Sequence, residues 1–140
     1  MFLLDTNILS ELVKKRSDVG VVRRVLSTRP ETLFASEVTR YELRNGAALD
    51  PRCEELWREI AQRILPVPTW IPVGREVAMA TADLDANLRR GGRPIESMDA
   101  LIAGTALAFD LVLVTRNVRH FAHVPGLAVE NWFPEGRGAT

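Results

Sequence analysis

The fold of this chain is decided by the stretch FLLDTNILSEL at residues 2–12. Its apolar run at residues 2–4 is typical of a short buried strand. The run ends at residues 5–7, Asp-Thr-Asn, which are residue types that favour helix caps and turns. Apolar residues then recur at helical spacing. The stretch therefore predicts a buried strand that leads directly into a helix.

Strand and helix patterns alternate along the rest of the chain. Further strands are predicted at residues 32–35, 111–114 and 127–129, with a peripheral extended segment at 67–73. Helical spacing and capping residues predict helices over residues 19–26, 36–49, 51–65, 74–90 and 97–109. Continuous apolar strands that alternate with helices indicate an α/β fold, in which helices flank both faces of a central parallel sheet.

The composition narrows the class of protein. With 46% hydrophobic and 26% charged residues, the 140-residue chain has globular proportions. We expect one domain over residues 1–133 and a flexible tail at residues 134–140. The formal net charge of zero argues against binding nucleic acid by bulk charge alone. No apolar run approaches the ~18 residues that span a bilayer, and the single cysteine, Cys53, favours a reducing compartment, so we expect a cytoplasmic protein without a membrane segment.

Three carboxylates lie at positions where a charge is costly. Asp5 directly follows a buried strand, and Asp99 lies in the first turn of the most apolar helix. Glu42 falls on the same face of the predicted helix 36–49 as Val38, Tyr41, Asn45 and Leu49. In a parallel α/β sheet such residues meet beyond the carboxyl ends of the strands, and clustered carboxylates recruit a divalent cation. We therefore predict an Mg²⁺ or Mn²⁺ site held by these three acids.

Each of these acids also has a purely structural interpretation. Asp5 could cap the first helix, and Asp99 could complement the dipole of its own helix. Glu42 could pair with a buried arginine. The convergence of all three on one crevice favours the metal site.

The residues that follow the predicted strand 111–114 add polar groups to the same edge. Thr115 could hydrogen-bond a carboxylate or simply end the strand, and Asn117 could complete the site with a neutral oxygen or act as a turn residue. Arg116 and Arg119 flank this segment and are candidates for contact with nucleic-acid phosphate, although an exposed arginine is commonly just a surface residue.

Four motifs in the sequence resemble those of PIN-domain toxins of the VapC type, including FitB-like members. They are LDTNILSEL at residues 4–12, VTRYEL at 38–43, DALIA at 99–103 and LVTRNVRHF at 113–121. The resemblance covers residues 1 to about 133, with the motifs in the family's order and separation. It implies a metal-dependent endoribonuclease that acts as the toxin of a type II toxin–antitoxin pair.

The resemblance also implies roles for individual residues and partners. It places Asp5, Glu42 and Asp99 at the family's first three acidic positions, and Asn117 at a fourth position where many PIN nucleases carry aspartate. Three formal negative charges favour one firmly held metal, with a second recruited alongside the RNA phosphate. The family further implies products with a 5′-phosphate and a 3′-hydroxyl, a homodimer, and a small antitoxin protein that blocks the site.

Two other functions compete with this hypothesis. A PIN nuclease could process DNA or RNA without being a toxin, but the short chain carries no appended domain. A catalytically silent PIN fold could only bind RNA or a partner, but it would not need three inward carboxylates. His120 and His123 lack a zinc-site spacing, and we expect both to pack or cap.

Overall fold

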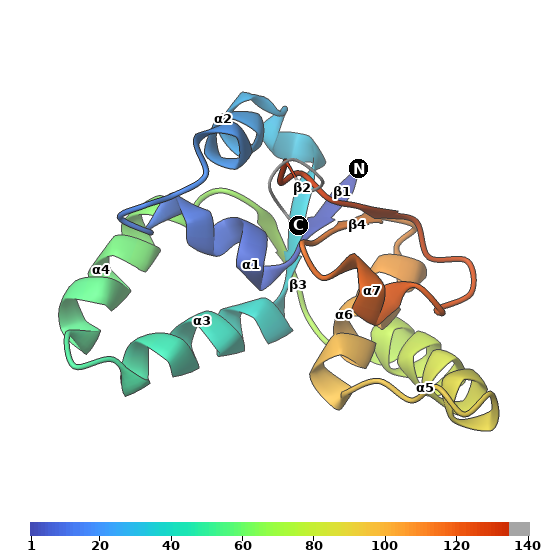
Figure 1. The fold of residues 1–140 in the computed structure, drawn as a ribbon. Coiled ribbons are helices and arrows are strands. Elements are labelled where there is room, and N and C mark those ends of the chain that lie inside the picture. The colour runs from blue at the N-terminus through green and yellow to red at the C-terminus, as the bar shows by residue number, and fades with distance from the viewer. Residues whose placement is uncertain (135–140) are drawn as a thin grey trace.

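A five-stranded parallel sheet forms the centre of the molecule (Figure 1). The computed structural model describes residues 1–134. The strands are, in order across the sheet, β3 (Thr69–Ile71), β2 (Leu33–Ser36), β1 (Phe2–Leu4), β4 (Val112–Val114) and β5 (Val129–Glu130). Leu4 at the end of β1 lies opposite Val114 at the end of β4. The next residue on each strand, Asp5 and Thr115, therefore comes to the same edge of the sheet.

The helices within residues 1–134 connect these strands and lie on both sides of the sheet (Figure 1). They are α1 (Thr6–Leu9), α2 (Val19–Ser27), α3 (Glu37–Leu49), α4 (Cys53–Arg63), α5 (Arg75–Arg90), α6 (Ser97–Ala108) and α7 (Val118–Phe121). Short 3₁₀ turns, η1 (Ser10–Leu12) and η2 (Pro30–Thr32), follow α1 and precede β2.

The sheet separates two hydrophobic cores because successive strand residues point to opposite faces. Leu4 belongs to a core that includes residues of α1, α2, α3 and α4. Leu3 belongs to the other core, which is built mainly from α5, α6 and α7. The predicted parallel sheet with helices on both faces is thus confirmed.

Several details differ from the sequence prediction. Helix α4 begins at Cys53 rather than at residue 51, because the Asp50 carboxylate accepts a hydrogen bond from the Arg52 N–H and holds the chain in a turn. The predicted apolar face of α3 is only partly correct: Val38 is buried, but Tyr41 and Leu49 are 55% and 78% exposed. Helix α7 was not expected. The predicted flexible tail at residues 134–140 lies outside the described residues beyond position 134.

No helix in residues 1–134 combines the length and the apolar character that crossing a bilayer requires.

Helices α5 and α6 pack tightly against each other, at a point where α6 carries a glycine. A Cβ added at Gly104 would lie 3.0 Å from the Thr81 Cα and closer still to the Thr81 side chain. The Thr81 hydroxyl is itself buried without a hydrogen-bond partner among the described residues. Only a residue without a side chain fits at this crossing, so Gly104 allows α5 and α6 to approach each other closely.

We expect Gly104→Ala to lower the free energy of unfolding by about 1–3 kcal/mol, because overpacking forces the two helices apart. Gly46→Ala is the matched control. An added Cβ on the exposed side of α3 meets nothing within 4 Å, and alanine should raise helix stability by up to about 1 kcal/mol. Urea denaturation measures both. Equal effects of the two substitutions would contradict the close approach, whereas partial rescue of Gly104→Ala by Thr81→Ala would support it.

Candidate active site

The carboxylate of Asp5 lies at the end of β1 and is held by donors from two directions. Its Oδ1 accepts a hydrogen bond of 2.8 Å from the Thr6 N–H, which makes Asp5 the N-cap of α1. Its Oδ2 accepts a 2.8 Å hydrogen bond from the Thr115 hydroxyl beyond β4. Asp5 is only 6% exposed and Thr115 is fully buried. The predicted capping role and a role at a polar site therefore coexist in one side chain.

Thr6 extends the same network to α3. Its hydroxyl donates a 2.6 Å hydrogen bond to Oε1 of Glu42 and lies 3.3 Å from the Thr39 hydroxyl. Glu42 is half-buried, and its carboxylate is thereby turned toward the end of β1 rather than toward a buried arginine. The interpretation of Glu42 as an inward-facing acid is consistent with this geometry, although Tyr41 and Leu49, predicted on the same face of α3, are exposed.

Asn7 joins α1 to the segment that follows β4. Its side-chain N–H lies 3.3 Å from both Oδ2 of Asp5 and the Thr115 hydroxyl. Its Oδ1 accepts a 3.0 Å hydrogen bond from the backbone N–H of Arg116. The three consecutive residues 5–7 thus each connect the end of β1 to a different partner.

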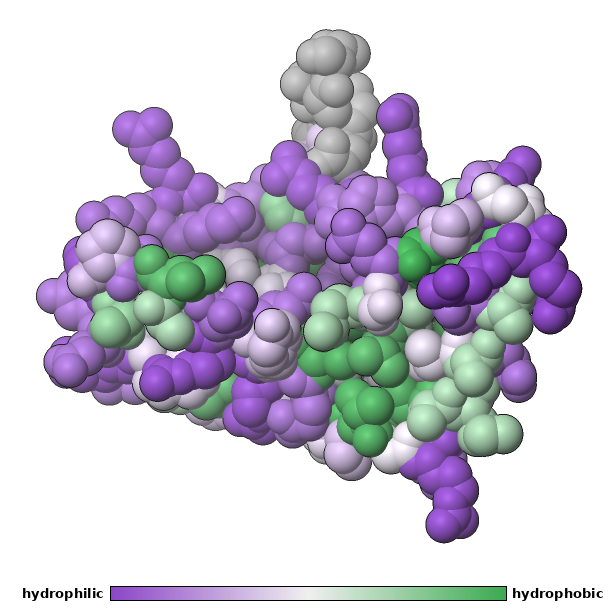
Figure 2. Space-filling model, turned by 90° about the horizontal axis from the view of Figure 1, so that it is seen from below, coloured by the Kyte–Doolittle hydropathy of each residue, from purple (hydrophilic) through white to green (hydrophobic). Residues whose placement is uncertain are grey.

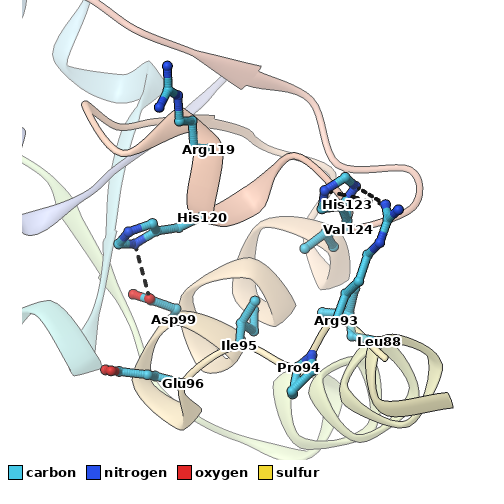
Figure 3. A pocket seen from close by; sticks show the side chains of 10 residues that line it. All are labelled: Leu88, Arg93, Pro94, Ile95, Glu96, Asp99, Arg119, His120, His123 and Val124. Atoms are coloured by element: carbon cyan, nitrogen blue, oxygen red, sulfur yellow. Dashed lines mark hydrogen bonds and ion pairs between the residues drawn. The ribbon is translucent and has the colours of Figure 1, made fainter. Parts of the chain in front are cut away.

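Asp99 lies in the first turn of α6, as predicted, and faces α7 (Figure 3). Its Oδ2 lies 3.6 Å from Nδ1 of His120, whose side chain is 60% exposed. His120 was expected to pack or cap, and this expectation is wrong, because the imidazole projects from α7 over the carboxylate.

The pKa of each of the three acids is raised above its ordinary value. Burial is the main cause at Asp5, where hydrogen bonds from Thr115 and Thr6 work in the opposite direction and the charge of Asp99 raises the pKa further. Burial also raises the pKa of Glu42, assisted by the charges of Asp5 and Asp99 and opposed by the Thr6 hydrogen bond. The pKa of Asp99 is raised by burial and by Glu96, against the lowering effect of His120.

This donor set fits a divalent cation. Carboxylate oxygens are the hard ligands that Mg²⁺ and Mn²⁺ prefer, and the acids share a region where their charges repel. Among residues 1–134, however, no group of three or more Asp, Glu, His or Cys side chains is already arranged to hold a metal ion. Binding a cation at Asp5, Glu42 and Asp99 would therefore require these side chains to draw together.

The other predicted residues lie around this centre in different ways. The Thr115 hydroxyl accepts a 3.0 Å hydrogen bond from the Asn117 N–H, so it positions both Asp5 and the start of α7. The Asn117 side chain is exposed and caps no N–H of α7. The Arg116 guanidinium lies 4.4 Å from the centre of the Phe133 ring. Arg119 is exposed on α7 and lines a pocket beside Asp99.

Sequence reasoning treated Thr6 and Asn7 only as turn residues. Their hydrogen bonds to Glu42 and Arg116 join residues that are far apart in the sequence. The one sequence signal for them was the run of three polar residues, 5–7, directly after a buried strand. His120 lies one helical turn after Asn117, a spacing that could have placed it at the same edge.

Comparisons with known proteins agree with this arrangement. The PIN domain family matches residues 2–127. VapC ribonuclease Y4jK of Sinorhizobium fredii is 33% identical, over 96% of this chain and 99% of that protein. The tRNA(fMet)-specific endonuclease VapC of Shigella flexneri is 32% identical, over 94% of this chain and 97% of that protein.

Solved structures give the same result. FitAcB from Neisseria gonorrhoeae superposes with a TM-score of 0.85 at 31% identity, covering 94% of this chain and 98% of that one. A toxin–antitoxin complex from Klebsiella pneumoniae gives 0.69 at 26% identity, covering 95% and 98%. The chain belongs to the PIN-domain family and, within it, to the relatives of the VapC ribonucleases. The resemblance seen in the four sequence motifs is confirmed.

The raised pKa values predict how the stability of the metal-free protein depends on pH. The folded state binds protons at Asp5, Glu42 and Asp99 more tightly than the unfolded chain does. The free energy of unfolding should therefore fall as the pH rises from the ordinary carboxyl range through the raised folded-state values. Asp99→Asn removes one of these charges, so its melting temperature should exceed that of the wild type by a margin that grows with pH.

Melting curves recorded in EDTA between about pH 4 and pH 7 test this expectation. Asp85→Asn is the control, because Asp85 lies on α5 in an ion pair with Arg89, away from the three acids. Adding Mg²⁺ at neutral pH should stabilise the wild type more than Asp99→Asn. A margin that stays constant with pH, or shrinks, would contradict the mutual repulsion of the acids.

Proposed function

We propose that this protein is the toxin of a type II toxin–antitoxin pair and an endoribonuclease that hydrolyses RNA phosphodiester bonds with the aid of a divalent cation. The observation that carries the proposal is the convergence of Asp5, Glu42 and Asp99, which come from three separate elements: the charge of Asp99 raises the pKa of Asp5, and the charges of Asp5 and Asp99 raise the pKa of Glu42. PIN-domain nucleases generally depend on divalent metals, and the relatives reported above are named ribonuclease and endonuclease.

Asp5, Asp99 and Glu42 would hold Mg²⁺, and Mn²⁺ would substitute for it. The bound ion would supply an acidified water as nucleophile and neutralise charge that develops on the phosphate oxygens. The protein's own contribution is orientation. Thr115 and Thr6 fix the oxygen atoms of Asp5 and Glu42 by hydrogen bonds of 2.8 Å and 2.6 Å, so these carboxylates lose little freedom when a ligand arrives.

Three further residues would contact the RNA or complete the site around it: Asn117, Arg116 and Arg119. Asn117 would add a neutral oxygen, because its exposed side chain is not used as a helix cap. Arg119 is exposed on the turn of α7 that also carries His120, so its guanidinium can reach a phosphate near Asp99. Arg116 would contact the backbone of the substrate beside Asn7. The products would carry a 5′-phosphate and a 3′-hydroxyl.

The partners would be a second copy of the chain and a small antitoxin protein. Figure 2 shows two hydrophobic areas on the face seen from below, a larger one on the side of α5 and α6 and a smaller one toward α4. Exposed Tyr41 and Leu49 on α3 add apolar surface. An antitoxin arginine that reached Asp5, Glu42 or Asp99 would block the site by pairing with the charges that a cation would otherwise neutralise.

The domain that carries this activity would span residues 1–133. We expect it to act in the cytoplasm, where its RNA substrate is present, and the one cysteine, Cys53, is free and suits a reducing compartment.

We expect Asp99→Asn to reduce RNA cleavage at least about 100-fold while leaving the fold intact, because the substitution removes one charged ligand of the cation. Sequencing of RNA ends after induced expression, together with cleavage of purified RNA in Mg²⁺, provides the measurement. Asp85→Asn should cleave like the wild type. Undiminished cleavage by the wild type in excess EDTA would rule out the metal-dependent mechanism.

Asn117→Asp should lower the Mg²⁺ concentration that gives half-maximal cleavage by about tenfold. An added carboxylate attracts a doubly charged ion by on the order of 1–2 kcal/mol at ~4 Å even with water-like screening. Turnover need not rise, since tighter binding of the ground state does not stabilise the transition state. Asn117→Ala should change the melting temperature little, because the side chain caps no donor of α7. An unchanged Mg²⁺ midpoint in Asn117→Asp would remove this residue from the metal site.

A further inference from the structure

Asp99 lines a pocket of about 370 Å³ whose lining includes neither Asp5 nor Glu42 (Figure 3). It lies between the segment that joins α5 to α6 and the segment that begins with α7. Its volume falls within the range of roughly 300–1,000 Å³ that is usual for sites binding small molecules. The roles given above to Asp99 and Arg119, which line it, do not explain the part of the cavity beside Arg93 and His123.

The two ends of the pocket differ in charge. Glu96, Asp99 and His120 lie at one end, and Arg93 and His123 lie at the other (Figure 3). The acidic end belongs to the candidate active site, because Asp99 is one of its three carboxylates. The basic end is therefore connected to the reaction centre through a single continuous cavity.

Arg93 presents a guanidinium that is free to bind an anion. Its Nη1 lies 2.6 Å from Nδ1 of His123, and within residues 1–134 no carboxylate lies at ion-pair distance from it. An arginine carries five N–H donors in a planar fork, so a contact with His123 orients the group and leaves donors for phosphate oxygens. His123, which was expected to pack or cap, instead lies at the surface beside Arg93.

The middle of the pocket is apolar. Leu88 and Val124 are almost fully buried and form part of its floor, and half-buried Ile95 projects between the two charged ends (Figure 3). Pro94 adds a further apolar surface. Such walls suit the face of a sugar or a base, whereas a phosphate would be poorly solvated there.

We propose that this pocket is a nucleotide subsite of the active site, in which Arg93 binds the phosphate next to the one that is cut and the apolar floor contacts the nucleoside between the two phosphates. The inference rests on the proposed ribonuclease function, since it takes the RNA backbone to pass Asp99. An acid end, an apolar middle and a basic end match a strand whose cut phosphate lies at the cation and whose neighbouring phosphate lies at a guanidinium. Continuity with Asp99 favours RNA over an acidic segment of a protein partner.

Binding of RNA without cleavage tests this inference. The probe is a short fluorescein-labelled single-stranded RNA of random sequence, and its anisotropy is followed in EDTA over a series of KCl concentrations. Arg93→Gln should weaken binding about tenfold and reduce the slope of log K against log salt by about 0.7, the value for one lost phosphate contact on a single strand. Arg90→Gln is the matched control, because Arg90 is an exposed arginine of α5 that does not line the pocket.

Several outcomes would overturn the inference. Equal losses in Arg93→Gln and Arg90→Gln would show a general effect of charge, and unchanged RNA affinity with a lower melting temperature would show a structural role for the contact with His123. Unchanged RNA affinity with weakened binding of the antitoxin would assign the pocket to the protein partner. Should Arg93→Gln fail to fold, Arg93→Lys keeps the charge and the stem. It should retain the salt slope but bind RNA about threefold more weakly, because it lacks the two-pronged donor, and wild-type affinity would overturn the inference.

The same measurements separate this inference from the proposed function. A wild type that binds RNA through Arg93 but cleaves none in Mg²⁺ would reject the ribonuclease function and keep the subsite. A wild type that cleaves RNA, with Arg93→Gln unchanged in both affinity and KM, would reject the subsite and keep the function. A wild type that neither binds nor cleaves RNA would reject both.

Discussion

The hydrogen bond from the Thr115 hydroxyl to the Asp5 carboxylate is the constraint on which the site depends. A carboxylate that is 6% exposed must be solvated by the protein itself, and Asp5 receives donors from Thr6, Asn7 and Thr115. Meeting that requirement locks the end of β1 to the end of β4. The same two side chains also hold the first turn of α1, through the Thr6 N–H, and the chain leading into α7, through the Asn117 N–H.

The electrostatics of the site oppose its stability. Burial, together with repulsion from neighbouring carboxylates, raises the pKa of Asp5, Glu42 and Asp99, so the folded protein would be more stable without these charges at neutral pH. His120 and the hydroxyl groups of the two threonines offset only part of the cost. Such a cluster binds positive charge favourably, because a bound cation relieves the repulsion between the carboxylates. A cation, and an arginine from a protein partner, would therefore compete for the same three acids.

The fold followed from the sequence because its strands are short, apolar and bounded by turn residues, and because burial on both faces leaves no other arrangement for them. The wheel for α3 oriented Glu42 inward but placed exposed Tyr41 and Leu49 beside it, since periodicity alone cannot say which apolar residues a domain leaves uncovered. Helix α7 has four residues, too few for a periodic signal. The role of Asn7 depends on a hydrogen bond from the backbone N–H of Arg116. The two residues are far apart along the chain, so local sequence patterns could not predict this contact.

The position of the central strand has a consequence for protein synthesis. β1 contains residues 2–4, so the ribosome makes the middle of the sheet first, but its neighbour β4 begins only at residue 112. Asp5 and Glu42 emerge long before Asp99 and Thr115, which complete the cluster and hold it. A nascent chain at that stage carries two of the three acids without the Thr115 hydroxyl that orients Asp5. Pairing over so long a separation is a slow step in folding, and the acidic cluster cannot be assembled until nearly the whole domain has been translated.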